Sequence, residues 1–159
     1  MGKVLVCYYS RTGNTEEMAE KIAEVMKAER LDVDLAKVEK TKVDELLNYD
    51  CLVLGSPTYY GSMAWPMKKL LDESVKFHGR MRGKIGGAFS SSANVGGGNE
   101  TTILSILKAL LIHGMIVQGD SSGDHYGPVS IGTPDKRALK NCERYAKNLS
   151  ALVKKINAY

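Results

Sequence analysis

The sequence predicts an α/β fold, a three-layer sandwich in which helices cover both faces of a five-stranded parallel sheet. Strand and helix patterns alternate five times along the 159 residues. Strand segments such as residues 4–9 are continuous apolar runs, typical of strands buried on both faces of a parallel sheet. The first strand passes through a short polar turn directly into a helix, as in doubly wound sheets, for which we expect the order 2-1-3-4-5.

Each element follows from its own pattern. Strands are expected at residues 4–9, 32–38, 51–54, 84–90 and 115–117; the second alternates apolar and polar residues, as an edge strand does. Helices are expected at 15–29, 64–76, 100–113 and 135–156, with a short helical turn at 43–47, because apolar residues recur every three or four positions. Val75 and Leu111 are among the residues that this spacing places inward. Loops at 55–62 and 91–98 are rich in glycine and small polar residues.

Composition indicates one globular domain over residues 1–159, with 43% hydrophobic and 25% charged residues. No run of about 18 apolar residues is present, so no membrane span is expected. The first strand begins too early for a signal peptide, which favours a cytoplasmic protein. The formal charge of +4 is too small and too scattered to indicate a nucleic-acid partner.

The three cysteines show no pairing framework, which fits a reducing compartment. Cys7 and Cys51 lie within apolar strands and Cys142 on the apolar face of the last helix. We therefore expect all three to pack in the core. No cluster of cysteines and histidines has the spacing of a metal site, so no metal is expected.

A phosphate-binding turn is predicted where the first strand meets the first helix. There, free backbone N–H groups and the positive end of the helix dipole converge. Gly13 allows a positive φ at low cost. The turn consists of Ser10, Arg11, Thr12, Gly13, Asn14 and Thr15, and apart from the arginine it is uncharged. Such a cradle suits a terminal monophosphate.

Two further loops lie at the same edge of the predicted sheet, because the carboxyl ends of parallel strands meet there. The loop after the third strand contains Tyr59 and Tyr60, whose flat rings and hydroxyls suit a planar ligand. The loop after the fourth strand is small, polar and rich in free amides, which can approach the edge of a heteroaromatic ring. Phosphate cradle, aromatic rings and amides together indicate FMN.

The first loop resembles the [ST]-x-T-G-x-T phosphate motif of flavodoxins at every fixed position. The later loops are similar to those of the WrbA-type NAD(P)H:quinone oxidoreductases. Residues 55–63 resemble G-T-P-T-[RY]-[FY]-G-x-M, and 89–102 resemble F-[ST]-S followed by G-G-[GQ]-x-E-T-T. Residues 113–115 match H-G-M, and 125–127 resemble P-Y-G. This chain lacks two insertions that help to build the tetramer and substrate pocket in that family.

The resemblance implies a flavodoxin-like fold and non-covalently bound FMN. It also implies a flavin-based reaction with no catalytic side chain. It assigns the phosphate to residues 10–15, with the ring system and ribityl chain near Pro57, Thr58, Tyr59, Tyr60, Gly61, Ser91, Ser92, Asn94, Gly96, Gly97 and His113. The expected activity is that of an NAD(P)H:quinone oxidoreductase. The alternative is a one-electron carrier that serves a redox partner protein, and a third possibility is a flavin-binding regulatory protein. A homodimer or tetramer stays open.

Simpler interpretations stand beside several of these residues. Tyr59 and Tyr60 could form a surface turn or a subunit contact, and His113 could end its helix before Gly114 as C-cap. His125 and Tyr126 could belong to the last loop only, and Trp65 could pack or form an interface. Other phosphate sites are excluded, because G-x-x-x-x-G-K-[ST], G-x-G-x-x-G and a cysteine nucleophile in the first loop are all missing. The strand ends also lack the carboxylates of a receiver domain.

Overall fold

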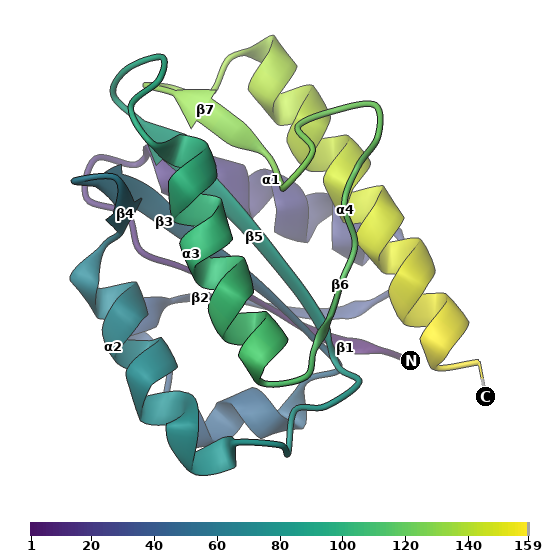
Figure 1. Cartoon of the computed structure of the whole chain (residues 1–159). Helices are drawn as coiled ribbons and strands as arrows, with labels where there is room; N and C mark the ends of the chain where they lie inside the picture. Colours follow the sequence, from purple (N-terminus) through teal and green to yellow (C-terminus); the bar gives the residue numbers. More distant parts are fainter. Residues whose placement is uncertain (159) are drawn as a thin grey trace.

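The computed structural model describes residues 1–158 and shows a parallel sheet covered by helices on both faces (Figure 1). Its order is β2-β1-β3-β5-β6, and each of these neighbouring strands pairs in parallel. The strands are β1 Lys3–Tyr8, β2 Asp32–Lys37, β3 Cys51–Tyr59, β5 Ile85–Ser92 and β6 Ile116–Val117. The predicted fold class and strand order are therefore confirmed.

Two hydrophobic clusters, one on each face of the sheet, hold the layers together. Along β1, Val4, Val6 and Tyr8 enter one cluster, whereas Leu5 and Cys7 enter the other, because successive side chains of a strand point to opposite faces. Helices α1 Asn14–Ala28 and α4 Lys136–Ile156 cover the first face. Helices α2 Trp65–Glu73 and α3 Asn99–Ile112 cover the second, together with the 3₁₀ turns η1 Val38–Lys40, η2 Val43–Asn48 and η3 Ser74–Phe77.

Strand β3 extends beyond its predicted end at residue 54 into the expected loop. It continues because it pairs with β5 as far as Pro57 and Ser91. It then turns into β4 Ser62–Met63, an antiparallel partner, through Tyr60 and Gly61. Both turn residues have positive φ, 47° and 77°, as a type I′ hairpin turn requires. Glycine at the second position favours this turn.

Val75 and Leu111 were expected to face inward and do not; this expectation was wrong. Val75 is 69% exposed because α2 ends at Glu73 and the chain continues in the tighter turn η3, which changes the direction of its side chains. Leu111 is 56% exposed. Helix α3 carries apolar residues on several sides, so spacing alone did not identify the buried side.

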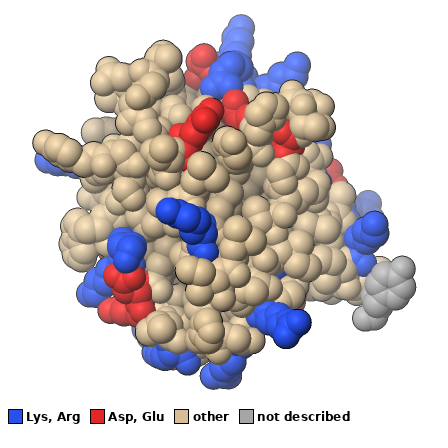
Figure 2. Space-filling model, viewed as in Figure 1, with Lys and Arg blue, Asp and Glu red and all other residues tan. Residues whose placement is uncertain are grey.

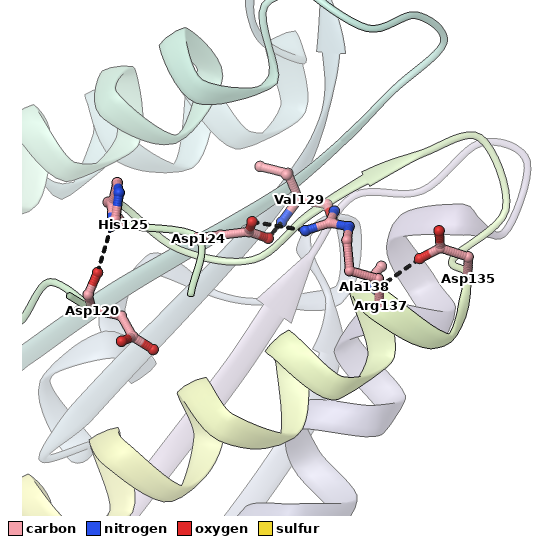
Figure 3. Close-up of polar contacts among 7 residues, drawn as sticks. All are labelled: Asp120, Asp124, His125, Val129, Asp135, Arg137 and Ala138. Carbon is pink, nitrogen blue, oxygen red and sulfur yellow. Dashed lines mark hydrogen bonds and ion pairs between the residues drawn. The ribbon is translucent and has the colours of Figure 1, made fainter. Parts of the chain in front are cut away.

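The fifth position in the sheet is filled by two short strands. Strand β6 pairs with the start of β5, and β7 Val129–Ile131 pairs with its end. The intervening loop 118–128 leaves the sheet and is tied to α4 by two carboxylates. Asp120 binds Arg144, and Asp124 accepts hydrogen bonds from the Val129 amide and from Arg137 at 2.9 and 2.8 Å (Figure 3).

All three cysteines are buried and free, which confirms their expected packing role. Burial raises the pKa of the Cys7 thiol to about 12, so it stays protonated at neutral pH. Within residues 1–158, no helix combines the length and apolar character needed to cross a bilayer. No group of three or more potential metal-ligating side chains converges in this part of the chain.

Candidate functional site

The turn between β1 and α1 leaves the first amides of the helix available. Gly13 precedes the helix with φ 97°, and no side chain caps the amides that follow. The Gly13 N–H itself donates to Ser10 Oγ at 3.1 Å, which closes the turn. No atom lies within 4 Å of the place where a Cβ on Gly13 would be. The turn is thus an open cradle of N–H groups at the positive end of a helix, where an anion is stabilised.

Hydroxyl groups join this cradle to the two neighbouring strand ends. Thr15 is 1% exposed, and its Oγ1 lies 2.8 Å from Ser91 Oγ at the end of β5. Thr58 Oγ1, near the end of β3, lies 3.2 Å from Ser90 Oγ and accepts from Thr102 Oγ1 at 3.0 Å. These bonds hold the three strand ends in fixed relative positions.

Tyr59 forms an aromatic wall beside the cradle. Its ring meets that of Tyr9 edge to face, with centroids 6.2 Å apart and planes at 81°. Burial raises the pKa of the Tyr59 hydroxyl, whereas Arg11 lowers it. The effect of burial is the larger, so this pKa lies above its ordinary value. The phenol is therefore neutral at physiological pH and can only exchange hydrogen bonds.

The three strand ends enclose a cavity of about 370 Å³. It is lined by Ser10, Arg11, Thr12, Asn14, Thr15, Pro57, Thr58, Tyr59, Ser91, Ser92, Ala93 and Gly132. All but the last two were among the predicted binding residues. Gly132 follows β7, and its N–H donates to Ser92 O at 2.8 Å. The alternating run Val129-Ser130-Ile131 was its only sequence signal, and it was too short to predict a strand.

Several other predicted residues surround the cavity without lining it. Tyr60 and Gly61 form the hairpin turn, and Thr101 Oγ1 donates to Gly61 O at 2.8 Å. Asn94, Gly96 and Gly97 belong to a loop that folds on itself: the amide of residue 97 donates to Asn94 O at 3.0 Å. Their binding roles therefore stay predictions.

The structure does not bring His113 to the cavity. Helix α3 begins beside the cavity and runs about 20 Å before His113 follows its last residue. Ser74 Oγ donates its hydrogen to Leu71 O at 2.6 Å and lies 2.8 Å from His113 Nε2. Burial, with a smaller effect of His78, lowers the pKa of the ring, which stays neutral at pH 7.

The remaining candidates also lie outside this cavity. His125 Nδ1 lies 2.8 Å from Asp120 O within loop 118–128 (Figure 3), and Tyr126 in the same loop is 44% exposed. Trp65 is 71% exposed at the start of α2. Among residues 1–158, Arg11 is the one charged residue that lines the cavity, and none of these lining residues is a carboxylate. The cavity therefore suits a ligand with an anionic end and an uncharged body.

The family model for flavodoxin matches residues 6–127. The chain belongs to the flavodoxin family. FMN is the cofactor of flavodoxins, and the cavity of this flavodoxin-family protein fits it. A monophosphate matches the uncapped amides of α1, the open space at Gly13 and the neutral hydroxyls. A ring system finds a flat wall at Tyr59 and polar groups at the end of β5.

Relatives of this flavodoxin-family chain carry two kinds of name. A flavodoxin of Aquifex aeolicus is 41% identical to this chain, and the similarity covers 96% of this chain and 88% of that flavodoxin. An NAD(P)H dehydrogenase (quinone) of Rhodopseudomonas palustris is 37% identical, and the similarity covers 77% of this chain and 73% of that dehydrogenase. The structure of a flavodoxin, WrbA-like protein from Agrobacterium tumefaciens superposes with a TM-score of 0.84 at 24% identity, over 98% of this chain and 99% of its own, and shows the shared fold.

Proposed function

We propose that the protein is an FMN-dependent NAD(P)H:quinone oxidoreductase. The observation that carries this proposal is the charge of the cavity: Arg11 lines it and no carboxylate does. Arg11 is exposed, so with FMN in the cavity it can still attract the negatively charged diphosphate of a nicotinamide dinucleotide, which a carboxylate at this place would repel. The quinone dehydrogenase from Rhodopseudomonas palustris supports the same activity.

Each residue class has a distinct role in this proposal. The 10–15 turn holds the FMN phosphate through N–H groups and hydroxyls. Tyr59 and residues 91–93 flank the ring, and Tyr60 stands fully exposed on the hairpin turn, where it leaves room for a substrate. Bound FMN supplies the two-electron chemistry, and the protein supplies position and hydrogen bonds.

The second candidate is a one-electron carrier, which the Aquifex flavodoxin favours because its similarity extends over nearly the whole chain. A carrier would receive and deliver electrons at a protein surface rather than bind a nucleotide. The two candidates thus differ in what reduces the protein and in how many electrons arrive at once.

Anaerobic reductive titration of the FMN-loaded protein tests the proposal. We expect NADH or NADPH to bleach the visible flavin absorbance in one step, with a quinone restoring it. Accumulation of a half-reduced form near the midpoint, with no reaction with either nucleotide, would instead support the carrier.

The Arg11→Gln variant, measured at saturating FMN, tests the role of the cavity cation. We expect its KM for the nucleotide to rise about tenfold, as loss of one charge-assisted contact of about 1.4 kcal/mol implies, with kcat little changed. Lys140→Gln is the matched control, because Lys140 is exposed on α4 and does not line the cavity. An unchanged KM in Arg11→Gln would contradict this role.

A further inference from the structure

A groove lies between α3 and the segment formed by α2 and η3. Its volume is about 740 Å³, which is in the range of sites that enclose small organic ligands. Within residues 1–158, the groove shares no lining residue with the cavity that fits FMN, so the two are separate hollows. Figure 2, viewed with α3 in front, shows a largely uncharged surface on this side of the molecule, interrupted by isolated charged side chains.

The hairpin of β3 and β4 forms the wall between the groove and the FMN cavity. Thr58 and Tyr59 on β3 line the cavity. Their cross-strand partners on β4, Met63 and Ser62, line the groove. Neighbouring strands lie about 4.8 Å apart, so only the width of this hairpin separates the two hollows. The turn at residues 60–61 is exposed, and a flexible chain can pass over it.

Apolar side chains line the groove from the hairpin to its far end. Met63 lies at the hairpin, Leu71 and Val75 stand on the wall of α2 and η3, and Ala109 and Ile112 stand on α3. Positions 105–112 of α3 extend this lining over about 10 Å. Val75 and Ile112, at 69% and 71% exposure, leave apolar surface in water that a bound group would cover.

The charged groups at the groove do not require an ionic ligand. Lys68 Nζ pairs with Asp72 Oδ1 at 2.6 Å on the α2 wall. Lys108 is exposed, so its ammonium group stays in water while its alkyl stem lines the opposite wall. His113 is buried and uncharged at pH 7. The groove therefore favours an elongated, uncharged apolar group.

We propose that this groove holds the apolar side chain of the quinone substrate, while the quinone ring lies at the flavin across the hairpin. The inference rests on the proposed function and names its substrate class: quinones with an isoprenoid or alkyl tail. Because ring and tail are covalently joined, binding of the ring brings the tail to the groove at high effective concentration. The tail takes no part in electron transfer, and its burial favours tailed over tail-less quinones.

Isothermal titration calorimetry of the oxidised, FMN-loaded protein tests the groove, because without a reductant the quinone binds and is not turned over. The probes are a dimethoxy-methyl-benzoquinone without a side chain and the same ring with a decyl chain. We expect the decyl compound to bind with a Kd at least tenfold lower, which burial of about two methylene groups already supplies. Ala109→Trp, which fills the groove, should abolish this preference by weakening binding of the decyl compound alone.

Leu104→Trp is the matched control, because Leu104 lies on the same helix and does not line the groove. It should change neither Kd. Ile112→Ser alters a position that is 71% exposed and so leaves the core intact; we expect it to raise the Kd of the decyl compound about threefold. Retention of FMN and of helical circular dichroism shows that each variant is folded. Equal Kd values for the two quinones, or a decyl preference that survives Ala109→Trp, would overturn the inference.

This measurement is separate from the reductive titration that tests the activity. If neither nucleotide reduces the flavin, the oxidoreductase function fails, although the calorimetric preference for the tail can still be measured. If both quinones reoxidise the reduced protein but bind with the same Kd, the activity stands and the tail site fails.

Discussion

At the scale of single residues, Asp120 fixes loop 118–128 to helix α4. Its carboxylate accepts hydrogen bonds from Arg144 Nε and Nη2 at 2.6 and 2.9 Å and from the Ser122 amide at 2.8 Å. The side chain is only 8% exposed, although it lies in a loop. Arg144 is the main reason that the pKa of Asp120 lies below its ordinary value of 3.8.

Asp120→Asn should therefore destabilise the protein by about 1.5–3 kcal/mol at pH 7, the range for hydrogen bonds to a charged group. Because the folded pKa is lowered, the charged carboxylate contributes its stability above the unfolded pKa, and the contribution is lost as pH falls through the folded value. Denaturant unfolding of both proteins between pH 7 and about pH 2 measures the difference. A difference that stays constant down to the lowest pH would contradict this assignment.

The position of a residue can be predicted from the sequence where the local pattern fixes the geometry. Thr12 and Thr15 line the cavity because a strand, a glycine and a helix start in succession leave few possible paths for the chain. His113 shows the opposite case: its position depends on the length and direction of α3, and Ser74, 39 residues away in the chain, occupies its Nε2. No local pattern reports such a partner.

At the scale of elements, the interrupted fifth strand leaves the middle of β5 without a strand partner on the side opposite β3. Strand β6 pairs with residues 85–86 and β7 with residues 90–92, so the amide of Ala88 lies between them. It donates instead to Tyr145 Oη of α4 at 2.9 Å, in a fully buried position. A side chain from a helix thus replaces the missing strand partner, as a buried N–H requires.

Tyr145→Phe removes this acceptor and leaves the Ala88 N–H unpaired. We expect a loss of about 1–3 kcal/mol in the free energy of unfolding, the cost of an unsatisfied buried donor. Denaturant unfolding measures it, with Tyr126→Phe in the exposed part of loop 118–128 as the matched control. Equal stability of the two variants would mean that water or a backbone shift satisfies the amide.

At the scale of the whole molecule, the cavity depends on three strand ends meeting at one edge of the sheet. The 10–15 turn supplies one side of it, and the ends of β3 and β5 supply the walls. A ligand that bridges them should stabilise the entire fold, because it binds the folded state and not the unfolded chain.

FMN at a hundredfold excess over its Kd should raise the free energy of unfolding by about 2.7 kcal/mol. For a chain of this length the gain corresponds to a rise in Tm of roughly 5–11 °C. Riboflavin, which lacks the phosphate, is the matched control and should give a clearly smaller rise at the same concentration. An equal rise with both ligands would contradict the phosphate role of the 10–15 turn.

The sequence by itself determined the α/β class, the strand order and the turn of residues 10–15 between β1 and α1. These features depend on apolar periodicity and on a turn whose geometry a glycine and a helix start dictate locally. The tertiary structure alone decided the hairpin after β3, the split fifth strand, the outward side of α3 and the distant position of His113. Each of these depends on hydrogen-bond partners or packing surfaces far away in the chain, which local patterns do not encode.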